Sequence, residues 1–145
     1  MRKAVFDTTT LVSAFLTKKG VSALLLQHAV AGAFELHLSE AIIAETQDVL
    51  LNRAHLRRQF IYTDHDVEEF CLLLKAFAHI VSDVPVLQVS RDPEDDYVIA
   101  TAVAAEVSHL ITRDKDLLTL TTYQGVQMVR PEEFMALVRQ QTAQE

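Results

Sequence analysis

The chain has 145 residues, 50% of them hydrophobic, and its 20 acidic against 13 basic residues give a net charge of -7 at pH 7. This length favours one domain, residues 1–145, around a single core and is too short for two ordinary domains. The negative charge argues against a protein that binds nucleic acid through overall positive charge, so such a role would need a local basic patch or bound cations.

The first third of the chain alternates short apolar runs with helical patterns. Residues 4–6 predict a buried strand that ends at Asp7, and the threonines at 8–10 offer hydroxyl caps to a helix that runs to Leu16. Residues 21–31 predict a second, strongly apolar helix that ends at Gly32. Residues 34–38 are the next strand candidate.

A carboxylate interrupts the apolar face of the helix predicted over residues 39–58. This helix begins at Ser39, and its stripe runs through Ile42, Glu45 and Val49 at spacings of three and four. An amphipathic helix with an aspartate cap is predicted over 64–78. One or two short extended pieces follow within residues 80–89.

The helix predicted to begin at Asp92 also has a carboxylate on its apolar face. Asp92 is expected to cap it, Pro93 fits its first position, and Asp95 follows in the first turn. Its apolar stripe includes Ile99, and three residues back along the same stripe lies Asp96. A second carboxylate therefore stands on a face that should be buried.

The last part of the chain predicts two more strands. Residues 109–112 are an apolar run of strand type, with Asp114 just beyond it, and residues 126–129 are the final strand candidate. Pro131 opens a terminal helix. The alternation of strands and helices predicts an α/β fold with a mostly parallel sheet covered on both faces.

Four acids occupy positions that a solvent-exposed charge does not explain. Asp7 and Asp114 follow strands, while Glu45 and Asp96 interrupt apolar stripes. Strand ends and the starts of the following helices meet at one edge of a parallel sheet, so these acids are expected to converge. Two carboxylates about 4 Å apart repel by roughly 4 kcal/mol at an effective dielectric of 20, which protonation or a cation would offset. All-oxygen ligands favour Mg²⁺ or Mn²⁺ over zinc, and paired ions of this kind support phosphodiester cleavage.

Several of these acids have competing interpretations. Asp92 is better explained as a helix cap than as a ligand, and Asp95 and Asp116 are either caps or supporting groups of the site. Glu45 has the alternative of pointing outward from the edge of its stripe. The histidines show no metal-ligand spacing, which indicates structural or surface roles. They are His28, His37, His55, His65, His79 and His109.

A local basic patch follows the Glu45 helix. Arg53, Arg57 and Arg58 would supply short-range attraction for phosphates despite the net charge. The alternative is a solvated helix end where the dipole favours cations.

Four segments of the sequence, in order, resemble the PIN-domain family of metal-dependent nucleases. They are VFDTTTLVSAFL, LSEAIIAETQDVLLNR, RDPEDDYVIATAVAAEVSHLITRDKDLL and VRPEEF. The resemblance is greatest to bacterial and archaeal members that act as toxin components. It implies the same four acids, Asp7, Glu45, Asp96 and Asp114, as the catalytic and metal-binding set.

The resemblance also assigns supporting residues and one departure. Thr112 is expected to buttress the site, with Asp92, Asp95 and Asp116 secondary. The family has D-x-N after its first strand, whereas this chain has Thr9 in place of the Asn. A hydroxyl there would replace the amide as an orienting group.

The family further implies a fold, a substrate and partners. The fold is a three-layer α/β/α arrangement with a sheet of about five mostly parallel strands. The substrate is single-stranded RNA, and the partners are a cognate antitoxin protein and a second copy of the chain in a homodimer.

Two alternatives to the nuclease remain. The run VFDTTTLV also resembles the first motif of haloacid-dehalogenase-like phosphatases, although Thr9 occupies the place of that motif's second acid. The other alternative is a catalytically degenerate PIN fold that binds RNA or a protein without cutting, which the same threonine motivates.

The sequence also predicts a compartment. Cys71 is the only cysteine, so no internal disulfide is possible. No apolar run approaches the roughly 20 residues of a membrane-spanning helix, and a signal-peptide core is lacking. We expect a soluble cytoplasmic protein that does not bind membranes.

Overall fold

The computed structural model describes residues 1–89 and 93–144. Within these ranges the strands are β1 (Lys3–Phe6), β2 (Glu35–Ser39), β3 (His79–Val81), β4 (His109–Ile111), β5 (Thr122–Tyr123) and β6 (Val126–Val129). The helices are α1 (Thr8–Leu16), α2 (Val21–Val30), α3 (Glu40–Asn52), α4 (Ala54–Gln59), α5 (Asp64–Phe77), α6 (Pro93–Ala104), α7 (Lys115–Leu120) and α8 (Pro131–Gln144).

The strands form one sheet in the order β3-β2-β1-β4-β6-β5. Every neighbouring pair from β3 to β6 is parallel, and only β5 pairs antiparallel, with β6. The predicted α/β class is therefore confirmed. The five parallel strands match the expected number, and β5 adds a two-residue antiparallel edge that the sequence pattern did not indicate.

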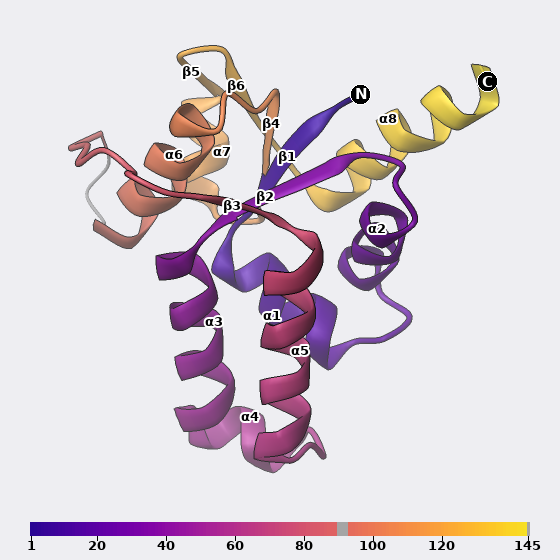
Figure 1. The fold of residues 1–145 in the computed structure, drawn as a ribbon, viewed down its shortest axis with the longest axis vertical. Helices are drawn as coiled ribbons and strands as arrows, with labels where there is room; N and C mark the ends of the chain where they lie inside the picture. Colours follow the sequence, from indigo (N-terminus) through magenta and orange to yellow (C-terminus); the bar gives the residue numbers. More distant parts are fainter. Residues whose placement is uncertain (90–92, 145) are drawn as a thin grey trace.

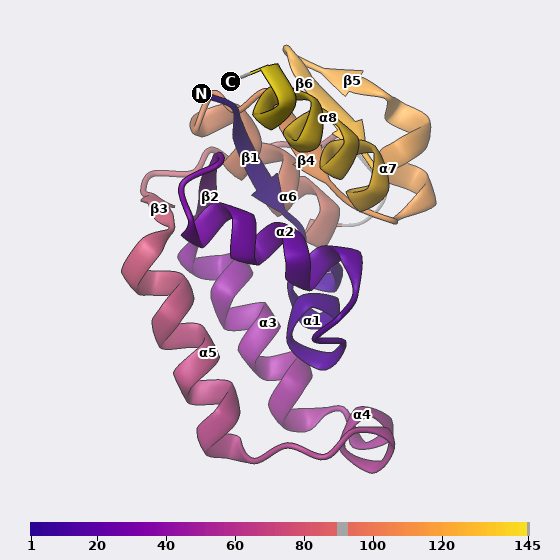
Figure 2. The same cartoon turned by 90° about the vertical axis from the view of Figure 1, so that its right-hand side faces the viewer.

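Helices cover both faces of the sheet (Figure 1, Figure 2). The helix α6 packs against β1, β2 and β4 on one face, and α2 and α8 lie together on the other. The helices α1, α3 and α5 contact one another beyond the carboxyl ends of β1 and β2. This arrangement brings the start of α1, α3 and α6 toward the edge where β1 and β4 end.

Aromatic packing anchors the face that α2 and α8 cover. The Phe34 ring lies 6.1 Å from the Phe6 ring and 4.9 Å from the Phe134 ring, the latter edge-on at 88°. All three side chains are fully buried. Large aromatic side chains in such contacts contribute both area burial and favourable ring geometry.

The predicted helix over residues 39–58 is wrong in its continuity. Arg53 adopts an extended conformation (φ -81°, ψ 106°) that ends α3 and starts α4. The Leu50 carbonyl, left unpaired by this break, accepts a hydrogen bond of 2.6 Å from the Tyr62 hydroxyl. The break lets Leu56 of α4 pack against the core instead of continuing the α3 stripe.

The helix starts also differ from the sequence pattern. The α1 helix is capped by Asp7 itself, with the threonines at 8–10 inside its first turn. Thr63 caps α5 in a capping box with Asp66, where an aspartate cap was expected. Ser39 caps α3 as expected. The expected cap of α6, Asp92, lies outside the described residues.

No single helix in the described part of the chain is long and apolar enough to cross a membrane. Helices α1 and α2 reach that length and composition only as a joined pair, and the pair is bent by 96°.

Removing the central ring of the aromatic cluster should destabilise the fold. We expect Phe34→Ala to lower the free energy of unfolding by about 3–5 kcal/mol, because it deletes buried surface and leaves a cavity. Denaturant titration would measure this loss. Leu72→Ala, at an α5 position that is 65% exposed, is the control and should cost far less. Equal losses in the two variants would contradict this account of the core.

Candidate active site

Asp7 is fixed where β1 ends and α1 begins. Its Oδ1 accepts a hydrogen bond of 2.8 Å from the Thr10 backbone N–H, and its own backbone N–H donates to the Ile111 carbonyl of β4 at 3.2 Å. The side chain is only 6% exposed. The carboxylate therefore serves as a helix cap and is held in one orientation beneath the surface.

Thr112 joins Asp7 to Asp114. Its buried hydroxyl donates a 2.5 Å hydrogen bond to Asp7 Oδ2 and accepts one of 2.9 Å from the Asp114 backbone N–H. Asp114 in turn caps α7, since its Oδ1 accepts from the backbone N–H groups of Asp116 and Leu117 at 2.9 and 3.2 Å. The supporting role expected of Thr112 has a direct geometric basis here.

A group of three acids surrounds the exposed end of this chain of hydrogen bonds. Carboxylate oxygens of Asp95, Asp114 and Asp116 lie within 4.8 Å of one another. Asp95 comes from the first turn of α6 and is half-buried, while the other two are exposed. The structure thus places Asp95 and Asp116, the two supporting groups predicted from the sequence, beside Asp114.

Glu45 and Asp96 each accept a hydrogen bond from another segment of the chain. Glu45 Oε2 accepts a 3.0 Å hydrogen bond from the Thr8 hydroxyl, which ties the middle of α3 to the residue after Asp7. Asp96 is buried, and its Oδ1 accepts a 3.0 Å hydrogen bond from the Val89 backbone N–H. It also lines a pocket of about 240 Å³ with Tyr97 and residues 85–88. Each of the two carboxylates is therefore anchored to its own neighbouring segment.

The buried environment of the Asp7 carboxylate favours a positively charged partner. Burial raises the pKa of the Asp7 carboxyl above its ordinary value of 3.8, and the nearby charge of Asp114 raises it further. Hydrogen bonds from Thr10 and Thr112 act in the opposite direction but do not cancel the effect of burial. Among the described residues, the groups that shift this pKa include no basic side chain.

The basic side chain that directly precedes Asp114 is engaged elsewhere. Arg113 forms a two-pronged ion pair with Glu132 of α8. Among the described residues, Asp7 and Asp114 form no ion pair, and their carboxylates present oxygen donors at the ends of β1 and β4. This donor set fits a hard divalent cation such as Mg²⁺ or Mn²⁺.

Thr9, the departure from the family motif, is exposed on α1. Its two neighbours carry the polar contacts of this turn. The Thr8 hydroxyl reaches Glu45, and the Thr10 hydroxyl donates to the Ile111 carbonyl at 3.1 Å. Sequence reasoning gave Thr8 and Thr10 only capping roles, because their partners on α3 and β4 are far away along the chain.

The basic patch lies at the far end of α3. Arg53 stands roughly 12 Å beyond Glu45 along the helix axis, at about 1.5 Å per residue. Arg57 is paired with Asp64 and lies 4.7 Å over the Tyr62 ring, so it supports the local fold. Arg53 and Arg58 are exposed. Two of the three arginines are thus available to a ligand that extends beyond the acids.

The spacing of the histidines along the sequence did not predict one other polar group. His37, His79 and Glu35 come together on β2 and β3, although the two histidines are far apart in the chain. The signal for this group is the strand register, which places His37 opposite His79.

The sequence between residues 3 and 116 matches the family model described as PIN domain. The chain belongs to the PIN domain family. The family is one of nucleases, and the matched segment contains all four acids of the predicted site. This match decides against the haloacid-dehalogenase-like alternative. Among curated proteins, none matches the sequence closely enough to count as a relative.

Solved structures share the fold of this PIN domain. A chain in the crystal structure of VapBC2 from Rickettsia felis, bound to a DNA fragment from their promoter, aligns with a TM-score of 0.59 at 10% identity. The alignment covers 88% of this chain and 98% of that one. The RRP44 PIN domain of T. brucei aligns with a TM-score of 0.47 at 13% identity, covering 99% of this chain and 84% of that one.

Removing the Thr112 hydroxyl should loosen the site. Thr112→Val keeps the shape but leaves the Asp114 N–H without its side-chain acceptor and Asp7 Oδ2 without the Thr112 donor, so we expect a loss of about 1–3 kcal/mol in unfolding free energy. Denaturant titration in the presence of EDTA would measure it. Thr119→Val, which removes an exposed α7 hydroxyl bonded to the Lys115 carbonyl, is the matched control. Equal effects would show that the Thr112 bridge has no special role.

The buried Asp7 carboxylate should make stability depend on pH. The pKa of the Asp7 carboxyl is raised in the folded state. Its favourable contribution to the free energy of unfolding is therefore fully present below the ordinary pKa of 3.8 and is lost as the pH rises through the folded pKa. In metal-free buffer, Asp7→Asn should therefore gain stability relative to the wild type as the pH is raised from this value to neutrality. Unfolding titrations at several pH values would measure the difference. Parallel profiles for the two proteins would refute the predicted charge burial.

Proposed function

We propose that this PIN domain is a metal-dependent ribonuclease that cleaves single-stranded RNA. Asp7, Glu45, Asp96 and Asp114 would hold Mg²⁺ or Mn²⁺ at the ends of β1 and β4. The observation that carries the proposal is the buried Asp7 carboxylate, which Thr112 ties to Asp114 and which has no basic partner among the described residues. A divalent cation is the natural counter-charge at this position.

Hydrogen bonds from neighbouring threonines hold two of the proposed metal-binding carboxylates in place. Bound metal would activate water and stabilise the leaving oxygen of a phosphodiester. Asp7 is positioned by Thr10 and Thr112, and Glu45 is positioned by Thr8. Because these partners fix the carboxylates in advance, little reorganisation is needed when a substrate binds.

The exposed side of the site offers further oxygen ligands. Asp95 and Asp116 stand beside Asp114 and are proposed as supporting ligands or as groups that orient water. Asp92, proposed for the same role from the sequence, lies outside the described residues. An RNA phosphate would approach from this exposed side, where the cation offsets the repulsion between the acids and the phosphate.

Exposed arginines extend the proposed substrate path. Arg53 and Arg58 lie at the end of α3 and on α4, where they would contact phosphates of an RNA that extends along α3 away from the cleaved bond. Arg57 contributes less in this proposal because Asp64 already pairs with it.

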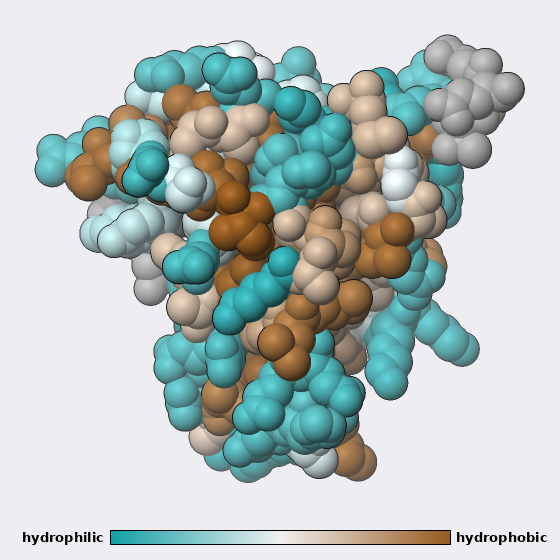
Figure 3. Space-filling model, viewed as in Figure 1, coloured by the Kyte–Doolittle hydropathy of each residue, from teal (hydrophilic) through white to brown (hydrophobic). Residues whose placement is uncertain are grey.

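We further propose that the protein is the toxin of a toxin–antitoxin pair and forms a homodimer. The structural likeness to a chain of the VapBC2 complex supports this assignment. Apolar surface is visible over β3 and α5 in Figure 3, elements that carry the exposed Ile80, Leu72 and Leu73. A protein partner would cover apolar side chains of this kind.

Neutralising an acid of the site should abolish RNA cleavage. We expect Asp7→Asn and Asp114→Asn to lower the cleavage rate of single-stranded RNA in Mn²⁺ by roughly 100-fold or more, the scale on which loss of one well-placed electrostatic group acts. Gel analysis of a labelled oligonucleotide would measure the rate.

Glu68→Gln, an exposed position on α5, is the control and should cleave like the wild type. Equal activity in every variant would identify a contaminating nuclease and sink the proposal. Tight RNA binding by the wild type without cleavage would instead favour a degenerate, binding-only PIN fold. Loss of growth that a small neighbouring reading frame relieves on co-expression would test the antitoxin assignment.

Metal should stabilise the folded protein through the same acids. At a free Mn²⁺ concentration one hundred times its Kd, binding should add about 2.7 kcal/mol to the unfolding free energy. Thermal or denaturant unfolding with and without Mn²⁺ would show this gain in the wild type and a reduced gain in Asp7→Asn. A wild type whose stability does not respond to Mn²⁺ would contradict an intact metal site.

A further inference from the structure

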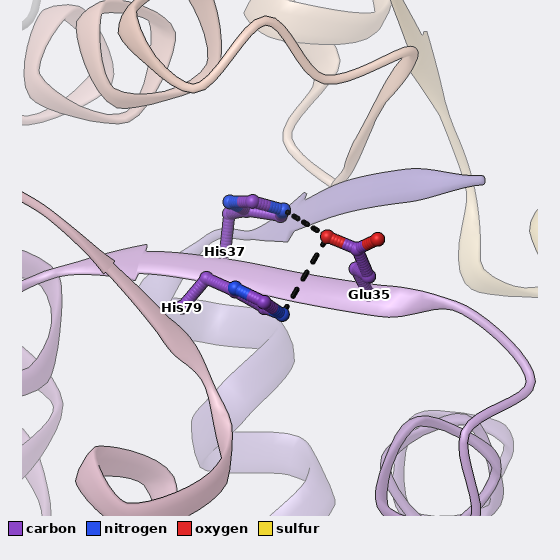
Figure 4. A group of neighbouring side chains, drawn as sticks. All are labelled: Glu35, His37 and His79. Atoms are coloured by element: carbon purple, nitrogen blue, oxygen red, sulfur yellow. Dashed lines mark hydrogen bonds and ion pairs between the residues drawn. The ribbon is translucent and has the colours of Figure 1, made fainter. Parts of the chain in front are cut away.

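A second polar cluster lies at the edge of the sheet, outside the carboxylate site. Glu35 and His37 are two residues apart on β2 and share one face of the sheet, and His79 of β3 is the cross-strand neighbour of His37. Figure 4 shows the two imidazole rings stacked, with Nε2 of each directed at the same Glu35 oxygen. The ring centroids are 4.6 Å apart with an interplanar angle of 18°.

The donor atoms have the spacing of ligands around one small cation. His37 Nε2 lies 3.2 Å and His79 Nε2 3.5 Å from Glu35 Oε1, and all three atoms lie within 4.8 Å of one another. Ligands at about 2.0–2.1 Å from a tetrahedral ion are separated by roughly 3.4 Å. An ion would therefore fit between these atoms with only small side-chain movements.

The environment keeps the inner ligand ready to bind. Burial lowers the pKa of the His37 imidazole below its ordinary value of 6.5, while Glu35 raises it and the charges of His79 and Lys3 lower it. The His37 ring is thus neutral at neutral pH, the form that binds metals. The His79 side chain is 57% exposed, so the site is open to solvent from the β3 side.

We propose that Glu35, His37 and His79 form a binding site for a late first-row divalent ion, with Zn²⁺ the best fit. Two imidazole nitrogens and one carboxylate oxygen suit zinc and disfavour Mg²⁺, whose preferred ligands are oxygens. In the tautomer that binds, the ring hydrogen stands on Nδ1, which leaves the Nε2 lone pair of each imidazole for the ion. A water molecule would complete the coordination.

Binding at this position would fasten the edge of the sheet. The β3 strand has only three residues, and two of them are exposed, so it has little burial to hold it. The segment that follows β3 includes Val89, whose backbone N–H donates to Asp96. A metal bridge between β2 and β3 would therefore fix the edge strand and the start of this segment.

The experiment uses the full-length chain without a histidine tag, titrated with Co²⁺ and then Zn²⁺ in excess Mg²⁺, which keeps the carboxylate site filled. The wild type should develop the visible absorption of Co²⁺ bound by nitrogen ligands, and Zn²⁺ should displace it. His79→Ala and Glu35→Gln should weaken binding by at least roughly tenfold, since loss of even the outer partners of metal ligands typically costs 10–100-fold. Because His79 and Glu35 are not core residues, both variants should fold.

His65→Ala is the matched control, because His65 is an exposed histidine 3.0 Å from Glu69 with no second histidine beside the pair. It should bind Co²⁺ and Zn²⁺ like the wild type. In NMR spectra, the imidazole signals of His37 and His79 should shift on adding Zn²⁺ while that of His65 should not. Wild-type affinity in His79→Ala, or no Zn²⁺ binding by the wild type, would overturn the proposal.

Discussion

The hydroxyl of Thr112 is the point on which the candidate site depends. It connects the ends of two neighbouring parallel strands by donating to Asp7 and accepting from the Asp114 amide. Because β1 and β4 are paired in register up to Phe6 and Ile111, their next residues are forced into contact. The hydrogen bonds of Thr112 therefore fix the two carboxylates in the arrangement that the register of β1 and β4 sets. Helices α1 and α7, each capped by one of these aspartates, then begin from the same place.

This arrangement concentrates negative charge on Asp7 and Asp114, which form no ion pair with the described residues. Asp7 is buried and its pKa is raised, Asp114 adds to the field, and Arg113 is turned toward Glu132. In the proposed nuclease, a divalent cation resolves two conflicts at once. It offsets the repulsion among the carboxylates, and it lets a chain with a net charge of -7 approach a polyanionic substrate. Without metal, the buried charge of Asp7 lowers the stability of the folded protein. We therefore expect metal binding to be tightly coupled to folding.

The two clusters differ in chemistry because they use different parts of the sheet. The acids stand at strand ends, where loops and helix starts provide carboxylates and backbone N–H groups. The histidine cluster stands within the strands, where alternation puts Glu35 and His37 on one face and register brings His79 beside them. Oxygen donors at the first position suit a hard ion, and imidazoles at the second suit a softer one. The two proposed sites would therefore prefer different metal ions.

The sequence by itself determined most of the element types and the identities of the candidate acids, while the short α7 and β5 left no recognisable pattern. Apolar periodicity indicated the strands that end at Asp7 and before Asp114 and the stripes that Glu45 and Asp96 interrupt, because hydrophobic burial leaves a local pattern. Only the tertiary structure decided the rest. The break at Arg53, the contact between Thr8 and Glu45, the place of Asp95 beside Asp114 and the pairing of His37 with His79 all depend on which segments pack together. Those contacts join residues distant in sequence, and local patterns carry no record of the strand order and register that create them.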